Sequence, residues 1–141
     1  MKNLYEVFDE FEEAKSKKDR MSVIEKNLSK VLVDVFELTY HPKCEWLLNE
    51  IPDGYKIAPD NIPGLSGNQL STEIRRMYLF QKGHPAAEQL TPQKRNELLL
   101  QLLERLEPRE AEVVMGILNK DLGVRGLDYK FVKEAFPSLL P

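Results

Sequence analysis

The sequence contains little of the chemistry that disulfides and most metal sites need. Cys44 is the one cysteine among 141 residues, and His41 and His84 are the two histidines. A single cysteine cannot form an internal disulfide or a multi-cysteine metal site, which indicates a reducing compartment. Each histidine directly precedes a proline, with no second histidine or carboxylate at metal-ligand spacing. We therefore expect no metal site, and structural or solvated roles for both histidines.

Common catalytic and nucleotide-binding motifs are absent too. The sequence has no G-x-x-x-x-G-K-[ST], G-x-G-x-x-G, H-E-x-x-H or G-x-S-x-G pattern. No histidine follows Cys44 at a spacing typical of a catalytic cysteine–histidine pair, so we expect Cys44 to be a small buried residue rather than a nucleophile. These absences predict a protein that is not an enzyme and that uses no cofactor.

Long apolar runs are also missing. No stretch of about 18 apolar residues is free of charge, and Met1 is followed by the acidic KNLYEVFDEFEE rather than by a basic segment and an apolar core. We therefore expect neither a membrane span nor a secretion signal, and a cytoplasmic location.

What the chain does have is the composition of an ordinary globular domain. Hydrophobic residues make up 42% and charged residues 30%, which is too apolar for a disordered tail. A chain of 141 residues suffices for one domain but is short for two, so we expect one domain over residues 1–141. The net charge is −3, yet residues 1–69 hold nine Lys and Arg against thirteen Asp and Glu, and residues 70–141 hold eleven against ten. A net acidic protein can still bind a polyanion if its cations share one face.

Apolar residues recur at three-and-four spacing through most of the chain, which is typical of amphipathic helices. The pattern predicts an all-α fold, a single compact helical domain of about seven or eight helices. Capping residues and prolines indicate where helices begin, at Asp19, Ser29, Thr91 with Pro92, Pro108 and Asp128.

The middle of the chain is less regular. Residues 42–52 predict a short helix that carries Trp46, because they lie between two prolines. Residues 52–67 read PDGYKIAPDNIPGLSG, which predicts a long irregular segment with a strand-like fragment at residues 55–57. The apolar spacing then predicts a helix over residues 70–80.

The chain closes with NKDLGVRGLDYKFVKEAFPSLLP, residues 119–141, which predicts two short helices joined by a GVRG turn. The glycines of this turn allow positive φ and leave backbone N–H groups unshielded, able to approach a phosphate. Such a hairpin can grip a nucleic-acid backbone. The spacing also fits an ordinary helical hairpin with surface cations. The basic residues around the turn are Lys120, Arg125, Lys130 and Lys133.

Two stretches carry a resemblance to a known family. The first is EAEVVMGILNKDLGVRGLDYKFVKEAFPSLLP, with an apolar helix, a basic KDL, a glycine turn, a second short helix and an aromatic-Pro-x-Leu close. The second is SVIEKNLSKVLVDVFELTYHPKCEWLLNEIP, in matching order along the chain. Together they resemble the N-terminal DNA-binding domain of ATP-dependent DNA ligases, especially those of large tailed bacteriophages.

The resemblance implies an all-helical domain that grips duplex DNA around a nick through the minor groove and the backbone. The turn GVRGL is one residue longer than the family's pattern leads us to expect. Carried over to this chain, the family's phosphate contacts would be Lys120, Gly123, Arg125 and Gly126, assisted by Lys130. Charge alone adds further candidate DNA contacts, Lys133, Arg75, Arg76, Lys94 and Arg95.

The resemblance also implies what this chain lacks. The family's adenylation motif, Lys-x-Asp-Gly, is missing, and NKDLG at residues 119–123 is not that motif because Asp directly follows Lys. The chain stops about where the nucleotidyltransferase domain would begin. We therefore expect either a free-standing DNA-binding protein or the non-catalytic domain of a longer ligase. The resemblance to phage enzymes implies a phage-encoded protein that acts in the host cytoplasm.

Our leading hypothesis is a non-catalytic, largely sequence-independent module for duplex or nicked DNA, acting in phage-type replication, repair or joining. The alternative is a protein–protein interaction adaptor on the same scaffold that binds a replication, repair or host protein, and the acidic N-terminal half favours it. A sequence-specific helix-turn-helix regulator is disfavoured, because the last helix offers only Lys130 and Lys133 as long donors for base edges.

Overall fold

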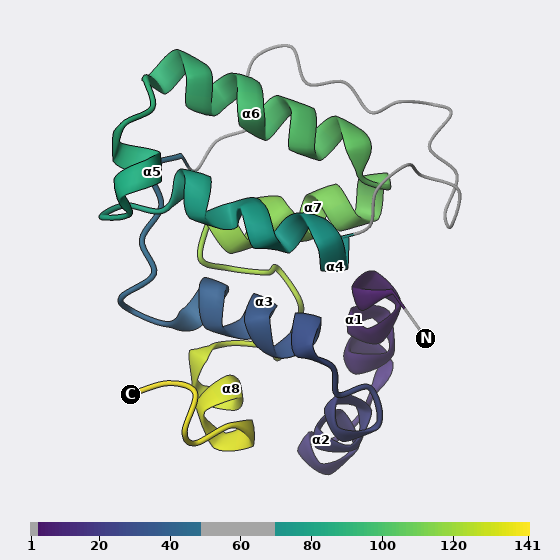
Figure 1. The fold of residues 1–141 in the computed structure, drawn as a ribbon. Coiled ribbons are helices and arrows are strands. Elements are labelled where there is room, and N and C mark those ends of the chain that lie inside the picture. Colours follow the sequence, from purple (N-terminus) through teal and green to yellow (C-terminus); the bar gives the residue numbers. More distant parts are fainter. Residues whose placement is uncertain (1–2, 49–69) are drawn as a thin grey trace.

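A computed structural model describes residues 3–48 and 70–141 of the chain, and within them it confirms the predicted all-α fold (Figure 1). No described helix is long and apolar enough to cross a membrane. The elements are α1 (Leu4–Glu13), α2 (Lys17–Lys26), α3 (Lys30–Tyr40), α4 (Leu70–Glu73), the 3-10 helix η1 (Ile74–Phe80), α5 (Pro85–Glu88), α6 (Pro92–Arg105), α7 (Pro108–Leu118) and α8 (Tyr129–Ala135).

Helix α7 lies at the centre of the domain. It packs against α1, α3 and α6, while α8 packs on the other side of α3 (Figure 1). Its apolar residues Val114 and Ile117 are fully buried, as expected of a helix surrounded by others. The helix brings the start of the last connection next to α3, where the candidate site lies.

Aromatic side chains join α1, α3 and the C-terminal segment in the core. The rings of Phe11 and Phe131 meet edge to face with centroids 4.9 Å apart, and those of Phe36 and Phe136 lie 5.9 Å apart. Phe11 and Phe36 are fully buried. Burying one such side chain contributes roughly 1.5–3 kcal/mol, so these rings hold α8 in place against the N-terminal half.

Most predicted helix starts are confirmed by their capping bonds. The hydroxyls of Ser29 and Thr91 and the carboxylate of Asp128 accept backbone N–H groups at the starts of α3, α6 and α8. The prediction of Asp19 as a cap is wrong. Ser16 caps α2, and its hydroxyl accepts the N–H of Asp19 at 3.1 Å, because a cap bonds the residue three positions on.

Two predicted helices take another form. The described part of residues 42–52 is not helical. Its backbone pairs instead with the segment after η1: Leu47 N–H donates to the carbonyl of Phe80, and Lys82 N–H donates to the carbonyl of Glu45, each at 2.8 Å. The segment Ile74–Phe80 is a 3-10 helix rather than an α-helix. The predicted strand-like fragment at residues 55–57 lies outside the described residues.

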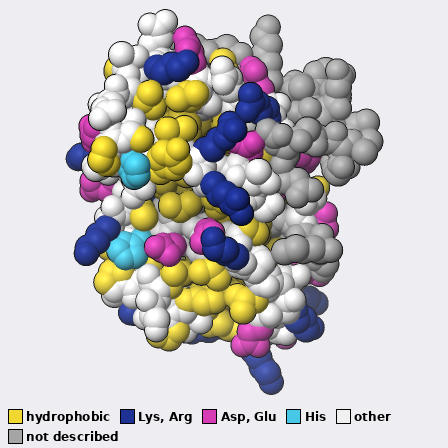
Figure 2. Space-filling view, viewed as in Figure 1, with side chains coloured by type: hydrophobic (Ala, Val, Ile, Leu, Met, Phe, Trp, Pro, Cys, Tyr) yellow, Lys and Arg dark blue, Asp and Glu magenta, His cyan; other side chains and the backbone are white. Residues whose placement is uncertain are grey.

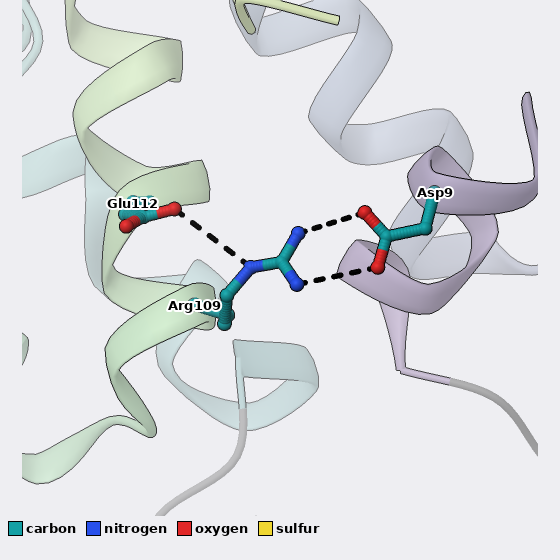
Figure 3. Close-up of polar contacts among 3 residues, drawn as sticks. All are labelled: Asp9, Arg109 and Glu112. Atoms are coloured by element: carbon teal, nitrogen blue, oxygen red, sulfur yellow. Dashed lines mark hydrogen bonds and ion pairs between the residues drawn. The ribbon is translucent and has the colours of Figure 1, made fainter. Parts of the chain in front are cut away.

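An exposed ion pair fastens α1 to α7 (Figure 3). The guanidinium of Arg109 donates to both carboxylate oxygens of Asp9, at 2.8 and 3.2 Å, and its Nε lies 3.9 Å from Glu112. The same guanidinium lies over the ring of Tyr5, 4.9 Å from its centroid. The hydrogen bonds from Arg109 lower the pKa of the Asp9 carboxyl. The pair therefore orients α1 at the surface rather than supplying much stability.

Candidate nucleic-acid interface

The predicted GVRG turn is part of a longer connection. Helix α7 ends at Leu118 and α8 begins at Tyr129, so we call residues 119–128 the hairpin loop. The prediction of a short helix directly before the GVRG turn is wrong, because α7 ends at Leu118 and Lys120 has a φ of 61°. Later in the loop Gly123 and Gly126 also have positive φ, at 70° and 86°, where glycine has no steric penalty.

Lys120 lies inside the loop's contact with α3 and not at its outer surface. Its ammonium donates to the carbonyl oxygens of Leu38, His41 and Cys44, at 3.3, 2.8 and 2.7 Å. Burial lowers the pKa of this ammonium. A cation at the carbonyl end of a helix stabilises that end. Lys120 therefore closes α3, and its donors are already used rather than free for a phosphate.

Further contacts fix the hairpin loop to the core. The hydroxyl of Tyr40 donates to the carbonyl of Leu127 at 3.2 Å, and burial raises the pKa of Tyr40 to about 12. Val124 and Leu127 are buried. The N–H of Gly123 donates to the carboxylate of Asp121 at 2.9 Å, so this N–H is not the unshielded donor that the sequence predicted. The loop is thus held in one conformation.

The start of α2 lies beside the hairpin loop and α8 (Figure 1). A Cβ placed on Gly126 would lie 2.9 Å from Nη1 of Arg20, so the guanidinium packs directly on the glycine backbone. The same guanidinium lies 5.9 Å from the ring centroid of Phe11. Lys17 forms an ion pair with Glu134 of α8. Gly126 is therefore needed for close packing against α2.

This arrangement brings two groups of cations to one surface, which we call the hairpin face. Arg125 and Lys130 are exposed, and neither has an ion-pair or hydrogen-bond partner within residues 3–48 and 70–141. Figure 2 shows Lys and Arg side chains at the lower edge of the molecule, over α2. The hairpin face comprises Arg125 and Lys130 together with two cations of α2, Lys17, which pairs with Glu134, and Arg20, which packs on Gly126.

The carboxylates on this face already accept hydrogen bonds or form ion pairs within the protein. Asp121 accepts from the N–H of Gly123, and Asp128 accepts from the N–H of Phe131 at 2.9 Å. Glu134 is paired with Lys17, so the carboxylates of Asp121, Asp128 and Glu134 each have a partner, within a chain of net charge −3. The sequence analysis missed the contribution of α2. Its signal was the run KSKKDR, residues 15–20, which has four cations in six positions.

Two other predicted DNA contacts, Lys133 and Arg95, donate hydrogen bonds to backbone carbonyls at or after helix ends. The ammonium of Lys133 donates to carbonyls of Pro137 and Leu140, at 3.1 and 2.7 Å. The guanidinium of Arg95 donates to carbonyls at the end of α5 and just after it, at 3.2 and 2.9 Å. Both side chains stabilise local structure, and both would have to break these bonds to grip a phosphate.

The remaining predicted contacts lie away from the hairpin face. Lys94 pairs with Glu97 on α6, and the Nε of Arg76 lies near Glu73, each at 3.6 Å. Helix α6 lies at the opposite end of the molecule from α2 and α8 (Figure 1). Arg75 is exposed and lines a separate cavity beside α3. The structure thus gathers only part of the predicted set at one surface.

The described residues offer little for metal binding or nucleophilic chemistry. They contain no group of three or more His, Cys, Asp and Glu side chains placed to hold a metal ion. Cys44 is buried, as predicted, and burial raises the pKa of its thiol. Burial therefore disfavours the thiolate, the form of cysteine that acts as a nucleophile.

Comparison with protein families matches this chain to a family model. The model of DUF6433, a family of unknown function, matches residues 7–124. The matched stretch includes most of the helical core together with Lys120 and Gly123, and it ends inside the hairpin loop. A search of curated proteins found no match.

Proposed function

We propose that this chain, which belongs to the DUF6433 family of unknown function, is a non-catalytic module that binds the backbone of duplex DNA irrespective of sequence. The observation that carries the proposal is the pair Arg125 and Lys130, which are exposed and without partners among the described residues. Arg125 lies on the hairpin loop, which is fixed to the core, and Lys130 lies in the first turn of α8. The neighbouring cations of α2 extend the same surface. The resemblance to ligase DNA-binding domains supports the proposal independently.

The anchoring of the hairpin loop matters for affinity. Ordering a loop or a long side chain on binding costs free energy that reduces the net affinity. Here Lys120 and Tyr40 fix the loop to α3 before any ligand arrives. Binding would then order only the cationic side chains, whose contacts with phosphates release condensed counterions. Such contacts position a protein on DNA without reading sequence.

A role in replication, repair or strand joining, and a bacteriophage context, rest on the resemblance alone. Fold likeness does not determine function. The surface itself supports only the coarser statement, a cationic face suited to a phosphate backbone.

The test is fluorescence anisotropy with labelled intact duplex, nicked duplex and single-stranded DNA over a range of salt concentrations. We expect salt-sensitive binding to duplex. Replacing Arg125 and Lys130 together by alanine removes two phosphate contacts, so the slope of log K against log[salt] should become shallower by roughly 0.9 per contact. The loss of affinity should be similar for unrelated sequences.

A charge-matched control separates local contacts from overall charge. Lys82→Ala with Lys94→Ala also removes two exposed cations, which pair with Glu45 and Glu97. This variant should bind DNA nearly as the natural chain does. Equal losses in the two double variants, or a flat salt dependence, would contradict a contact surface at the hairpin face.

The adaptor hypothesis gives a different result in the same experiments. Exposed acidic side chains on α1, among them Glu6, Glu12 and Glu13, are unfavourable to DNA but suited to a basic protein partner. A partner that stays bound in a nuclease-treated lysate, together with no DNA binding at low salt, would replace the DNA proposal with this one.

A further inference from the structure

A cavity of about 250 Å³ lies between the start of α3 and the α4–η1 segment, away from the hairpin loop. Figure 2 shows Lys and Arg side chains on this face, in the region where α3 and the α4–η1 segment lie. The cavity is lined by Ser29, Lys30, Val31, Asp34, Ser71, Ile74 and Arg75.

Two cations at the cavity, Arg75 and Lys30, form no strong interaction with described residues. Arg75 is exposed and has no ion-pair or hydrogen-bond partner among the residues that the structure describes. The ammonium of Lys30 lies 3.8 Å from Asp34, beyond hydrogen-bond length, and its side chain is 89% exposed. Both side chains can therefore turn toward a ligand without losing a strong contact. An arginine guanidinium binds phosphate oxygens through two parallel N–H donors.

The rest of the lining adds donors and an apolar wall. The hydroxyl oxygen of Ser29 accepts the N–H of Leu32 at 3.2 Å, which leaves its hydrogen able to donate to a ligand. The first turn of α3, an eleven-residue helix, contributes the positive end of its dipole. Val31 and Ile74 supply apolar surface.

We infer that this cavity binds a small phosphate monoester whose organic part carries hydroxyl groups, with Arg75 and Lys30 on the phosphate and Asp34 accepting from a ligand hydroxyl. A phosphate monoester carries a charge of about −1.5 to −2 at neutral pH, which two cations match. The volume is just below the usual range for small-molecule sites, roughly 300–1,000 Å³, so a sugar phosphate fits better than a larger cofactor.

This inference stands apart from the proposed DNA binding. It uses none of the hairpin face, and a phosphodiester in DNA carries one charge and no free hydroxyl for Asp34. The two proposals can therefore fail separately.

The test is calorimetric titration of the full chain with ribose 5-phosphate, inorganic phosphate and ribose, together with variants. We expect ribose 5-phosphate to bind more tightly than inorganic phosphate, and ribose not to bind. Arg75→Ala should weaken ribose 5-phosphate binding about tenfold or more, since it removes charge-assisted hydrogen bonds to the phosphate. Asp34→Asn should tighten inorganic phosphate binding, because it removes a repelling carboxylate.

Arg76→Ala is the matched control, because Arg76 is the next residue, is also exposed and does not line the cavity. It should bind ribose 5-phosphate as the natural chain does, and circular dichroism should show that both variants are folded at the titration temperature. Equal binding by the Arg75 and Arg76 variants would overturn the inference. So would equal affinity for ribose 5-phosphate and inorganic phosphate, or the absence of any binding at millimolar concentrations.

Discussion

The ammonium of Lys120 lies 2.7 Å from the carbonyl oxygen of Cys44, 76 positions earlier in the chain. With its bonds to His41 and Leu38, this contact joins the end of α7 to the end of α3. A basic residue that the sequence suggests as a ligand contact is instead part of the scaffold. The cations left to meet a ligand lie farther along the chain, Arg125 on the hairpin loop and Lys130 in the first turn of α8.

Replacing Lys120 by methionine should therefore destabilise the fold. The variant keeps the Cβ and the aliphatic stem but loses three donors, and the carbonyls at the end of α3 lose their partner. We expect the free energy of unfolding to fall by about 1–2 kcal/mol. The lower value is favoured because Lys120 is only half-buried, so water can replace part of the lost hydrogen bonds. Urea unfolding measures this fall. Lys130→Met is the control, and an equal effect of the two changes would contradict the role of Lys120.

Glu110 should make stability depend on pH. Its carboxylate is buried and accepts the N–H of Leu70 at 3.0 Å. Burial, and then the nearby Glu107, raise the pKa of Glu110 above its usual 4.5. The folded protein thus holds this proton more tightly than the unfolded chain does. The stability that the protonated group contributes is fully present below pH 4.5 and is lost as the pH rises through the folded-state pKa.

Glu110→Gln isolates this effect, because the amide can accept the same N–H but does not ionise. The variant's free energy of unfolding should be close to that of the natural chain near pH 4 and should exceed it increasingly toward pH 7. Thermal or urea unfolding across this range checks it, with exposed Glu112→Gln as the control. A Glu110 variant whose relative stability falls as the pH rises would show that the carboxylate is favoured in the fold.

The two glycines of the hairpin loop should respond differently to alanine. Both have positive φ, which alanine adopts with strain. After the stabilising effect of a less flexible unfolded chain is subtracted, each substitution should lower the free energy of unfolding by about 1 kcal/mol. A new Cβ at Gly123 meets nothing within 4 Å, whereas one at Gly126 meets the guanidinium of Arg20. Urea unfolding should therefore show a larger loss for Gly126→Ala. Equal losses would mean that Arg20 moves aside freely.

How far the sequence predicts this protein depends on the range of the interaction. Helix starts at Ser29, Thr91 and Asp128 are predicted because a cap bonds a residue three positions away. The extended backbone around Trp46 is not predicted, because it pairs with Gln81 and its neighbours far along the chain. Local pattern carries no information about such a partner.

The same distinction applies to the candidate site. Spacing identifies the glycine turn and its cations, but it cannot tell Lys120, whose partners lie about 80 positions earlier, from Arg125, which has no described partner. Nor can it bring Lys17 next to Glu134 of α8, since that proximity depends on how α2 packs against the hairpin loop and α8.

The exposed pair of Arg109 and Asp9 affects how any DNA-binding experiment on this protein must be designed. Added salt screens solvent-exposed charges over about 10 Å at 0.1 M, so it weakens this link between α1 and α7 as well as any contact with phosphates. Helix α1 supplies Phe11, which lies under Arg20 of the hairpin face. A change in ionic strength therefore acts both on the protein's own structure and on its contacts with DNA. A circular dichroism spectrum at each salt concentration would separate the release of DNA from the loosening of the protein that binds it.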